Sequence, residues 1–175
     1  ADTFQTSWAN SNLWKFTPNQ TLAVSGFMYC QGVVALPDGG VLAVDVGWLS
    51  GLSMDGRVVR LTGPTHISKL PREIITPTRN PVSPKLGPDG YVYLVDRGAF
   101  DFDPGWILRF LPGNPQAEIV LTGLNDPWDA AWAPDGTMFI TDEKNLMRWT
   151  PSTGVLETFA TGFGEATGVD VAPNG

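Results

Sequence analysis

The chain has 175 residues, of which 42% are hydrophobic, and one globular domain spanning residues 1–175 is the simplest expectation. Its formal net charge is −7, and its 11 lysines and arginines are scattered, which argues against a nucleic-acid partner because phosphate binding needs clustered basic side chains. No apolar run approaches the roughly 20 residues of a membrane span, and the single cysteine, Cys30, excludes an internal disulfide.

The first segment predicts three strands, at residues 4–8, 12–16 and 22–25. Its peptide NLWKFTP at 12–18 matches NLMRWTP at 145–151, with an offset of 133 residues. The matched region near the end of the chain is preceded by a further strand, whereas residues 4–8 are preceded by none. The chain is therefore expected to begin with three strands of a repeat that lacks its innermost strand.

A tripeptide, Pro-Asp-Gly, then recurs with its aspartates 51 and 46 residues apart, and a related Pro-Asn-Gly follows 39 residues later. Each copy separates an apolar run from an alternating apolar run, which indicates a β-hairpin. Seven residues after each Asp stands a second Asp. The repeated pairs are Asp38 with Asp45, Asp89 with Asp96, and Asp135 with Asp142, and the last copy holds Asn174.

Four short strands fit each full repeat, and periods of forty to fifty residues built this way are typical of propeller blades. The predicted fold class is all-β: a β-propeller of four-stranded antiparallel blades, with about four blades. The expected repeats are residues 1–25 with 166–175, then 26–77, 78–122 and 123–161. Their strands are expected at 32–36, 41–45, 57–61 and 73–76; at 82–86, 91–96, 105–111 and 117–121; and at 128–133, 137–142, 145–150 and 154–160.

Residues 166–172 predict an innermost strand that lacks its own partners. Pairing of this segment with residues 4–8 would complete a blade and close a ring. Closure would also remove two unpaired sheet edges, which otherwise favour association with other chains. The alternatives are that the chain is a portion of a longer propeller, or that two chains complete a ring together; open sheet edges then predict self-association.

The second Asp of each pair ends a strand. Asp45, Asp96 and Asp142 are expected to accept hydrogen bonds from backbone N–H groups of the turn that follows. A turn cap is needed in every blade, whereas a catalytic residue is usually needed once. The repetition therefore favours a structural role for all three.

Polar residues also recur where the innermost strands begin, close to the expected propeller axis. Oxygen ligands gathered there suit a hard cation such as Ca²⁺, and the alternative is that the same side chains cap turns. Both interpretations remain open. The positions nine residues before each hairpin Asp or Asn hold Tyr29, Asn80, Asp126 and Glu165, and those six before hold Gly32, Ser83, Asp129 and Gly168.

Aromatic and charged residues in the loops at the same end of the strands predict the rim of a small-ligand pocket. The alternative is that the aromatic side chains cover the cores of the blades. Tryptophans within strands, such as Trp14, Trp106, Trp132 and Trp149, are expected to pack between neighbouring sheets. The predicted rim consists of Tyr29, Trp48, Arg97, Phe100, Asp101 and Trp128.

Innermost strands that end in Pro-Asp-Gly, second strands that end in Asp, and third strands such as NLMRWTP resemble those of the NHL-repeat and SMP-30/gluconolactonase-like β-propellers. The resemblance covers the whole chain, although that family has six blades. It implies a bound cation held by Glu165 and Asn80, with Asp126 or Asp129 as the acid and base of catalysis. Only one Asn lies in the matching register, since Gln31 or Trp128 stands where another is expected.

Two functions follow from these features. The first is a binding or interaction module that meets a protein, a glycan or a small molecule on the axial face. The second is a Ca²⁺-dependent hydrolase of lactones or related esters. The start Ala-Asp-Thr suits a chain after removal of a signal peptide, and with the glycosylation sequon at Asn19 it predicts an extracellular or periplasmic location.

Overall fold

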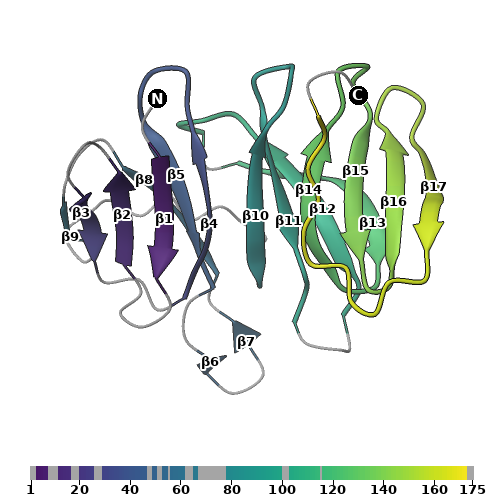
Figure 1. Cartoon of the computed structure of the whole chain (residues 1–175), viewed down its shortest axis with the longest axis horizontal. Coiled ribbons are helices and arrows are strands. Elements are labelled where there is room, and N and C mark those ends of the chain that lie inside the picture. The colour runs from purple at the N-terminus through teal and green to yellow at the C-terminus, as the bar shows by residue number, and fades with distance from the viewer. Residues whose placement is uncertain are drawn as a thin grey trace.

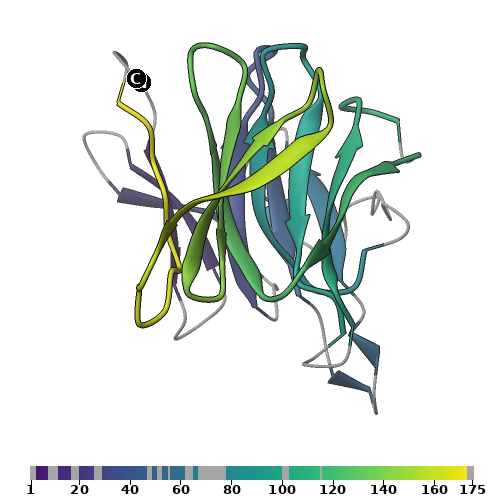
Figure 2. The same ribbon diagram turned by 90° about the vertical axis from the view of Figure 1, so that its right-hand side faces the viewer.

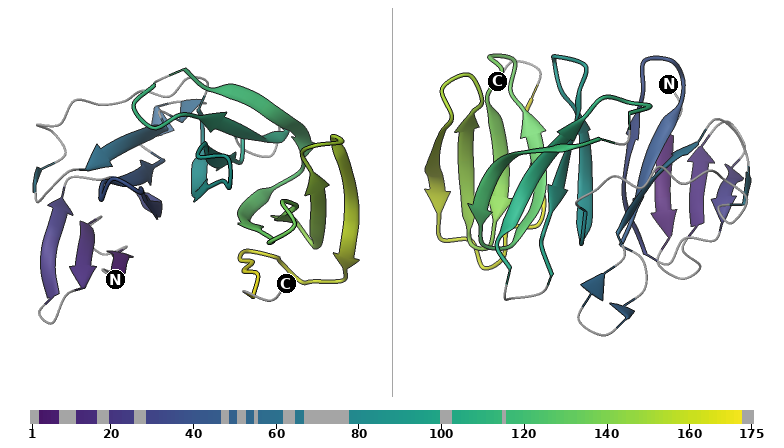
Figure 3. Two further views of the ribbon diagram at one scale, coloured as in Figure 1. Left: turned by 90° about the horizontal axis from the view of Figure 1, so that it is seen from above. Right: turned by 180° about the vertical axis from the view of Figure 1, so that it is seen from behind.

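The computed structural model describes an arc of four β-sheets that surround a common axis (Figure 1). Seen from above, the sheets follow one another like the blades of a propeller, and the arc stays open between the first sheet and the end of the chain (Figure 3). The structure describes residues 3–7, 12–16, 20–25, 29–46, 49–50, 53–54, 56–61, 65–66, 78–99, 103–114 and 116–172.

The first two blades are built from the N-terminal part of the chain. In the first, the short strand β9 pairs in parallel with β3, whereas all other described pairs are antiparallel. The first blade has the order β1 (Thr3–Ser7), β2 (Asn12–Phe16), β3 (Gln20–Ser25) and β9 (Thr65–His66). The second has β4 (Cys30–Ala35), β5 (Val41–Asp45) and β8 (Arg57–Leu61), with a small separate hairpin of β6 (Leu49–Ser50) and β7 (Ser53–Met54).

The third and fourth blades are four-stranded antiparallel sheets, as the repeat predicts. The third blade contains β10 (Pro81–Leu86), β11 (Val92–Asp96), β12 (Gly105–Phe110) and β13 (Glu118–Leu124). The fourth contains β14 (Pro127–Trp132), β15 (Met138–Asp142), β16 (Asn145–Thr150) and β17 (Val155–Thr161). The expected strand at 73–76 lies outside the described residues.

The expected closing pair is absent from the structure. Residues 162–172 form no strand, and β1 pairs only with β2 among the described strands. Three backbone donors of this segment have partners other than β1. Ala166 N–H donates to the Glu143 carbonyl at 2.8 Å, Val169 N–H to the Asp129 carboxylate at 3.1 Å, and Val171 N–H to its neighbour Asp170 at 2.9 Å.

The Pro-Asp-Gly hairpins share one turn geometry. In each, the Gly N–H donates to the carbonyl three residues earlier, and the Gly has a φ of +82° to +84° that an L side chain rarely adopts. A type I turn followed by such a left-handed residue is a common hairpin connection. The Asp side chain also accepts the N–H two residues later, as Asp135 does from Thr137 at 2.9 Å.

The aspartates that end β5, β11 and β15 have the predicted structural role, with a different set of partners. Their carboxylates accept mainly the N–H groups that precede the innermost strand of the same blade, because the antiparallel register places the end of the second strand beside that start. Burial raises the pKa of Asp96 and of Asp142, against the effect of these hydrogen bonds. Asp45 accepts from the Tyr29 N–H and from the Arg57 guanidinium; Asp96 from the N–H groups of Arg79, Asn80 and Gly98; and Asp142 from those of Asn125 and Asp126.

Two apolar clusters hold neighbouring blades together. One lies between the second and third blades and the other between the third and fourth, and Trp106, Trp132 and Trp149 pack there as predicted. The side chain of Trp14 lies outside the described residues. Trp149 is buried in the second cluster, and the Trp132 ring meets Tyr93 edge-on at 4.8 Å between centroids. The indole N–H groups of Trp106 and Trp132 are buried without a hydrogen-bond partner.

Glycines at the start of the third strands allow the blades to approach closely. A Cβ added to Gly105 would lie 2.4 Å from Pro127 Cδ, and one added to Gly56 would lie 2.3 Å from Pro81 Cδ. Each proline begins the innermost strand of the next blade. The repeated Gly and Pro contact therefore brings the third strand of one blade close to the innermost strand of the next.

Candidate functional site

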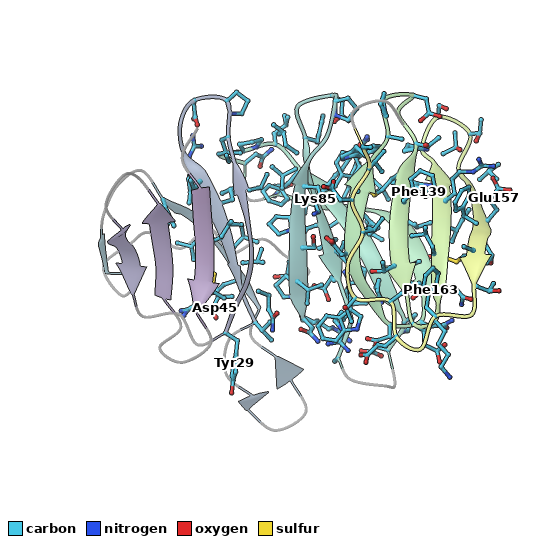
Figure 4. The ribbon with its side chains drawn as sticks, in the orientation of Figure 1. Tyr29, Asp45, Lys85, Phe139, Glu157 and Phe163 are labelled. Atoms are coloured by element: carbon cyan, nitrogen blue, oxygen red, sulfur yellow. The ribbon has the colours of Figure 1, made fainter. Side chains whose placement is uncertain are left out.

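A pocket of about 370 Å³ lies on the concave side of the arc, where the innermost strands face the axis. Three blades and the C-terminal segment supply its walls, so no single blade contains it. Figure 4 shows Lys85 beside β10, one of these innermost strands. The lining residues are Gln31, Gly32, Val33, Val82, Ser83, Pro84, Lys85, Trp128, Asp129 and Thr167.

Asp129 joins the parts of this pocket. Its Oδ1 accepts hydrogen bonds from Ser83 Oγ at 2.6 Å and from Lys85 Nζ at 2.9 Å, and its Oδ2 accepts the N–H of Val169 at 3.1 Å. Its own N–H donates to Thr141 Oγ1 at 2.9 Å. The carboxylate therefore connects β14 to β10 and to the C-terminal segment.

Asp126 lies just before β14, in a different set of contacts. Arg97 pairs with its Oδ1, with the Nη2 to Oδ1 distance at 2.6 Å, and Trp128 Nε1 donates to its Oδ2 at 3.2 Å. The Arg97 guanidinium also lies 3.6 Å from the centroid of the Trp128 ring. These three side chains contact one another and so link the third blade to the fourth. The predicted rim residues Arg97 and Trp128 and the acid Asp126 are called the latch below.

The other predicted metal ligands do not gather with Asp129. Asn80 is buried and its backbone N–H donates to Asp96, and Glu165 is exposed in the C-terminal segment. Within the described ranges, no group of three or more His, Cys, Asp or Glu side chains could hold a metal ion. The arrangement of Glu165, Asn80, Asp126 and Asp129 thus lends the predicted calcium site no support, and calcium binding stays a prediction.

The predicted rim is only partly described. Tyr29 is 50% exposed and extends away from the blades at the lower end of β4 (Figure 4). Trp128 lines the pocket, whereas Arg97 covers the Trp128 ring. Trp48, Phe100 and Asp101 lie outside the described residues.

Counting along the repeat placed both Asp129 and Ser83 near the axis but missed their partner Lys85. Ser83 and Lys85 stand on β10 two residues apart, so they share a face of that strand. A lysine in the innermost strand of a propeller blade, between a proline and a leucine, is the signal that could have been used. Thr167, which was expected in a closing strand, also lines the pocket.

No protein family and no curated protein matches this chain. Solved structures do match it. A structure from a nidogen and laminin complex aligns with 97% of this chain at a TM-score of 0.75 and 14% identity. A protein described as a gluconolactonase aligns with 86% at 0.59 and 16%, and virginiamycin B lyase from Staphylococcus aureus with 91% at 0.64 and 15%. These proteins are β-propellers. The fold of this chain is a β-propeller.

The chain spans 64%, 56% and 52% of the lengths of these three proteins. At such low identity the likeness concerns the fold alone, because propellers with one architecture carry unrelated functions. The activity and partners of this chain must therefore be argued from its own pocket. In the part of the chain that the structure describes, no helix has the length and hydrophobicity needed to cross a membrane.

Proposed function

We propose that this protein is a binding module that takes a small polar ligand in its axial pocket. The observation that carries the proposal is the pocket itself, which is about 370 Å³ in volume and is lined from three blades and the C-terminal segment. This volume lies within the range of about 300 to 1,000 Å³ that is usual for small-molecule sites.

The chemistry of the walls supports binding. Apolar groups from β4 and β10 stand beside the charged side chains of Lys85 and Asp129. The exposed part of the wall is more polar than apolar, so hydrogen bonds and charge, more than apolar contact, would select the ligand. Asp129 holds its position through Ser83, Lys85 and the Val169 N–H, so the polar part of the site is organised before a ligand enters.

Hydrolysis of lactones or esters has less support. Such a reaction would use Ca²⁺ to polarise a carbonyl group. The side chains expected to hold the Ca²⁺ ion do not lie together in the described part of the chain. The extracellular or periplasmic location and the protein or glycan partners rest on the sequence and remain parts of this proposal. A structure from a nidogen and laminin complex shares the fold.

A screen of small-molecule fragments, with NMR as the readout, tests the proposal. Compounds that bind should shift the backbone amide signals of residues in β4, β10 and β14 that line the pocket. Thr167→Trp should abolish these shifts, because the added ring would fill the space beside the C-terminal segment. Ser152→Trp, at an exposed turn after β16, is the matched control and should leave them unchanged. Shifts that fall elsewhere, or that survive in Thr167→Trp, would contradict the proposal.

A further inference from the structure

In the axial pocket, most hydrogen-bond acceptors of the acidic residue have partners, whereas the basic residue has donors without a protein partner among the described residues. Asp129, the acidic lining residue, already accepts three hydrogen bonds. Lys85, the basic lining residue, carries three N–H donors on its ammonium group and directs one contact to Asp129. The pocket therefore keeps donors on Lys85, whereas Asp129 already uses three of the roughly four acceptor positions of its carboxylate.

The position of Lys85 is fixed. The side chain is 34% exposed, and the ion pair with Asp129 at 2.9 Å holds its ammonium group at the pocket wall. Ser83 stabilises the same carboxylate oxygen from the same strand. A cation held in this way loses little conformational entropy when it meets an anion.

A small apolar surface lies next to this cation, because Val33 is only partly buried whereas Val82 and Pro84 are buried. Val33 of β4 and Val82 and Pro84 of β10 line the pocket together with Lys85. A ligand that fills the volume must therefore offer hydrogen-bond acceptors to Lys85 and can place only a small apolar part against Val33. The global charge of −7 opposes this only weakly, because charges on exposed surfaces are screened over about 8 Å at physiological ionic strength.

We propose that the axial pocket binds a small organic carboxylate, whose carboxylate group meets Lys85 and whose small body lies against Val33. This inference rests on the proposed function and specifies the chemical class of the ligand. Asp129 then acts as a positioning residue, since it orients the lysine and does not meet the ligand's carboxylate itself.

Benzoate and benzamide provide the test, because they have nearly the same shape and differ in charge. Titration of the intact chain, followed by amide chemical shifts, should show benzoate binding roughly ten to a hundred times more tightly than benzamide, as expected for a charge-assisted hydrogen bond. Lys85→Met keeps the apolar stem, and it should reduce this preference to near one. Lys85→Arg should keep a preference for the acid.

Lys144→Met is the matched control, because it removes an exposed lysine outside the pocket and should leave the preference unchanged. Melting curves of each variant establish that it is folded. Equal binding of benzoate and benzamide to the wild-type pocket would overturn the carboxylate proposal while leaving the binding function intact. Preference for benzoate that survives in Lys85→Met would also overturn it. If neither compound nor any screened fragment shifts the pocket amides, the proposed function fails as well.

Discussion

The third and fourth blades have the same strands and the same turns, yet only the third is covered on both faces. In the third blade, Tyr93 and Val95 point toward the fourth blade and are almost completely buried there. In the fourth blade, Phe139 stands at the position that matches Tyr93, four residues after the hairpin Asp. Phe139 is half-buried and meets Phe159 of its own blade edge-on at 4.9 Å between centroids. Figure 2 shows the fourth blade at the end of the arc, facing the viewer.

The same comparison can be followed through three blades. The matching position holds Leu42 in the second blade, which is fully buried against the third. Leu42, Tyr93 and Phe139 thus occupy one repeated position with different neighbours. The difference shows that burial in a propeller is a property of the contact between blades, because each sheet needs its neighbour to cover its apolar face.

Alanine substitutions at the two aromatic positions should show the largest difference in stability between the two blades. Tyr93→Ala removes contacts with both Trp132 and Trp149, and we expect it to lower the free energy of unfolding by about 3 to 5 kcal/mol. Phe139→Ala removes a half-buried ring and should cost about 1 to 2 kcal/mol. Urea denaturation of the two variants measures both values.

Tyr93→Phe separates the ring from the hydroxyl group, which donates to Asp89 at 2.9 Å. It should recover most of the stability that Tyr93→Ala loses, leaving a cost of about 1 kcal/mol for the hydrogen bond. Equal losses in Tyr93→Ala and Phe139→Ala would show that the two faces are equally buried in solution, contrary to the structure.

The sequence predicts the repeated parts of this fold well, because local chemistry specifies them. Proline fixes the first turn residue and glycine supplies the positive φ, so each Pro-Asp-Gly marks a hairpin that the structure contains. The prediction of a closing strand at residues 166–172 was wrong, and for a different reason. Its pattern suits a strand, but pairing depends on distant partners, and Asp129 and Glu143 take two of its N–H groups instead.

The pocket could be predicted only in part. The position of Asp129 near the axis follows from counting along the repeat, and the structure places it there. Its partnership with Lys85 depends on the side-by-side placement of β10 and β14, which are more than forty residues apart in the sequence. The sequence likewise grouped Asp126 with Asp129, although Arg97 and Trp128 hold Asp126 in a separate latch.

The buried aspartates that end the second strands, Asp96 in the third blade and Asp142 in the fourth, should both make the stability of the chain depend on pH in the same direction. Burial raises the folded-state pKa of Asp96 and of Asp142, so the folded chain binds more protons than the unfolded chain in the window above the ordinary Asp pKa of about 3.9. Stability should therefore fall as pH rises through this window, by no more than about 1.4 kcal/mol per pH unit for each group. Asp96→Asn and Asp142→Asn should each flatten this decline in urea denaturation series at several pH values.

Asp135→Asn is the control of opposite sign. Hydrogen bonds from the Thr137 hydroxyl and N–H lower the pKa of Asp135, so its contribution is present above the unfolded-state pKa and is lost as pH falls through the folded-state value. An unchanged pH dependence in Asp96→Asn would mean that this carboxyl group is hydrated in the folded state.

The smallest difference between the blades is expected at their outer strands, where both are exposed to solvent. Arg148 pairs with Glu157 at 2.5 Å in the fourth blade, and Arg109 pairs with Glu118 at the matching place in the third. Since all four side chains are at least one-third exposed, a double-mutant cycle on either pair, with Arg→Met and Glu→Gln variants, should give a coupling of only about 0.2 to 1 kcal/mol. Each coupling energy should be smaller still in 0.5 M salt, because the Debye length shortens there to about 4 Å. A coupling above about 2 kcal/mol for Arg148 with Glu157 alone would show that something covers the free face of the fourth blade in solution, because only a desolvated pair reaches such values.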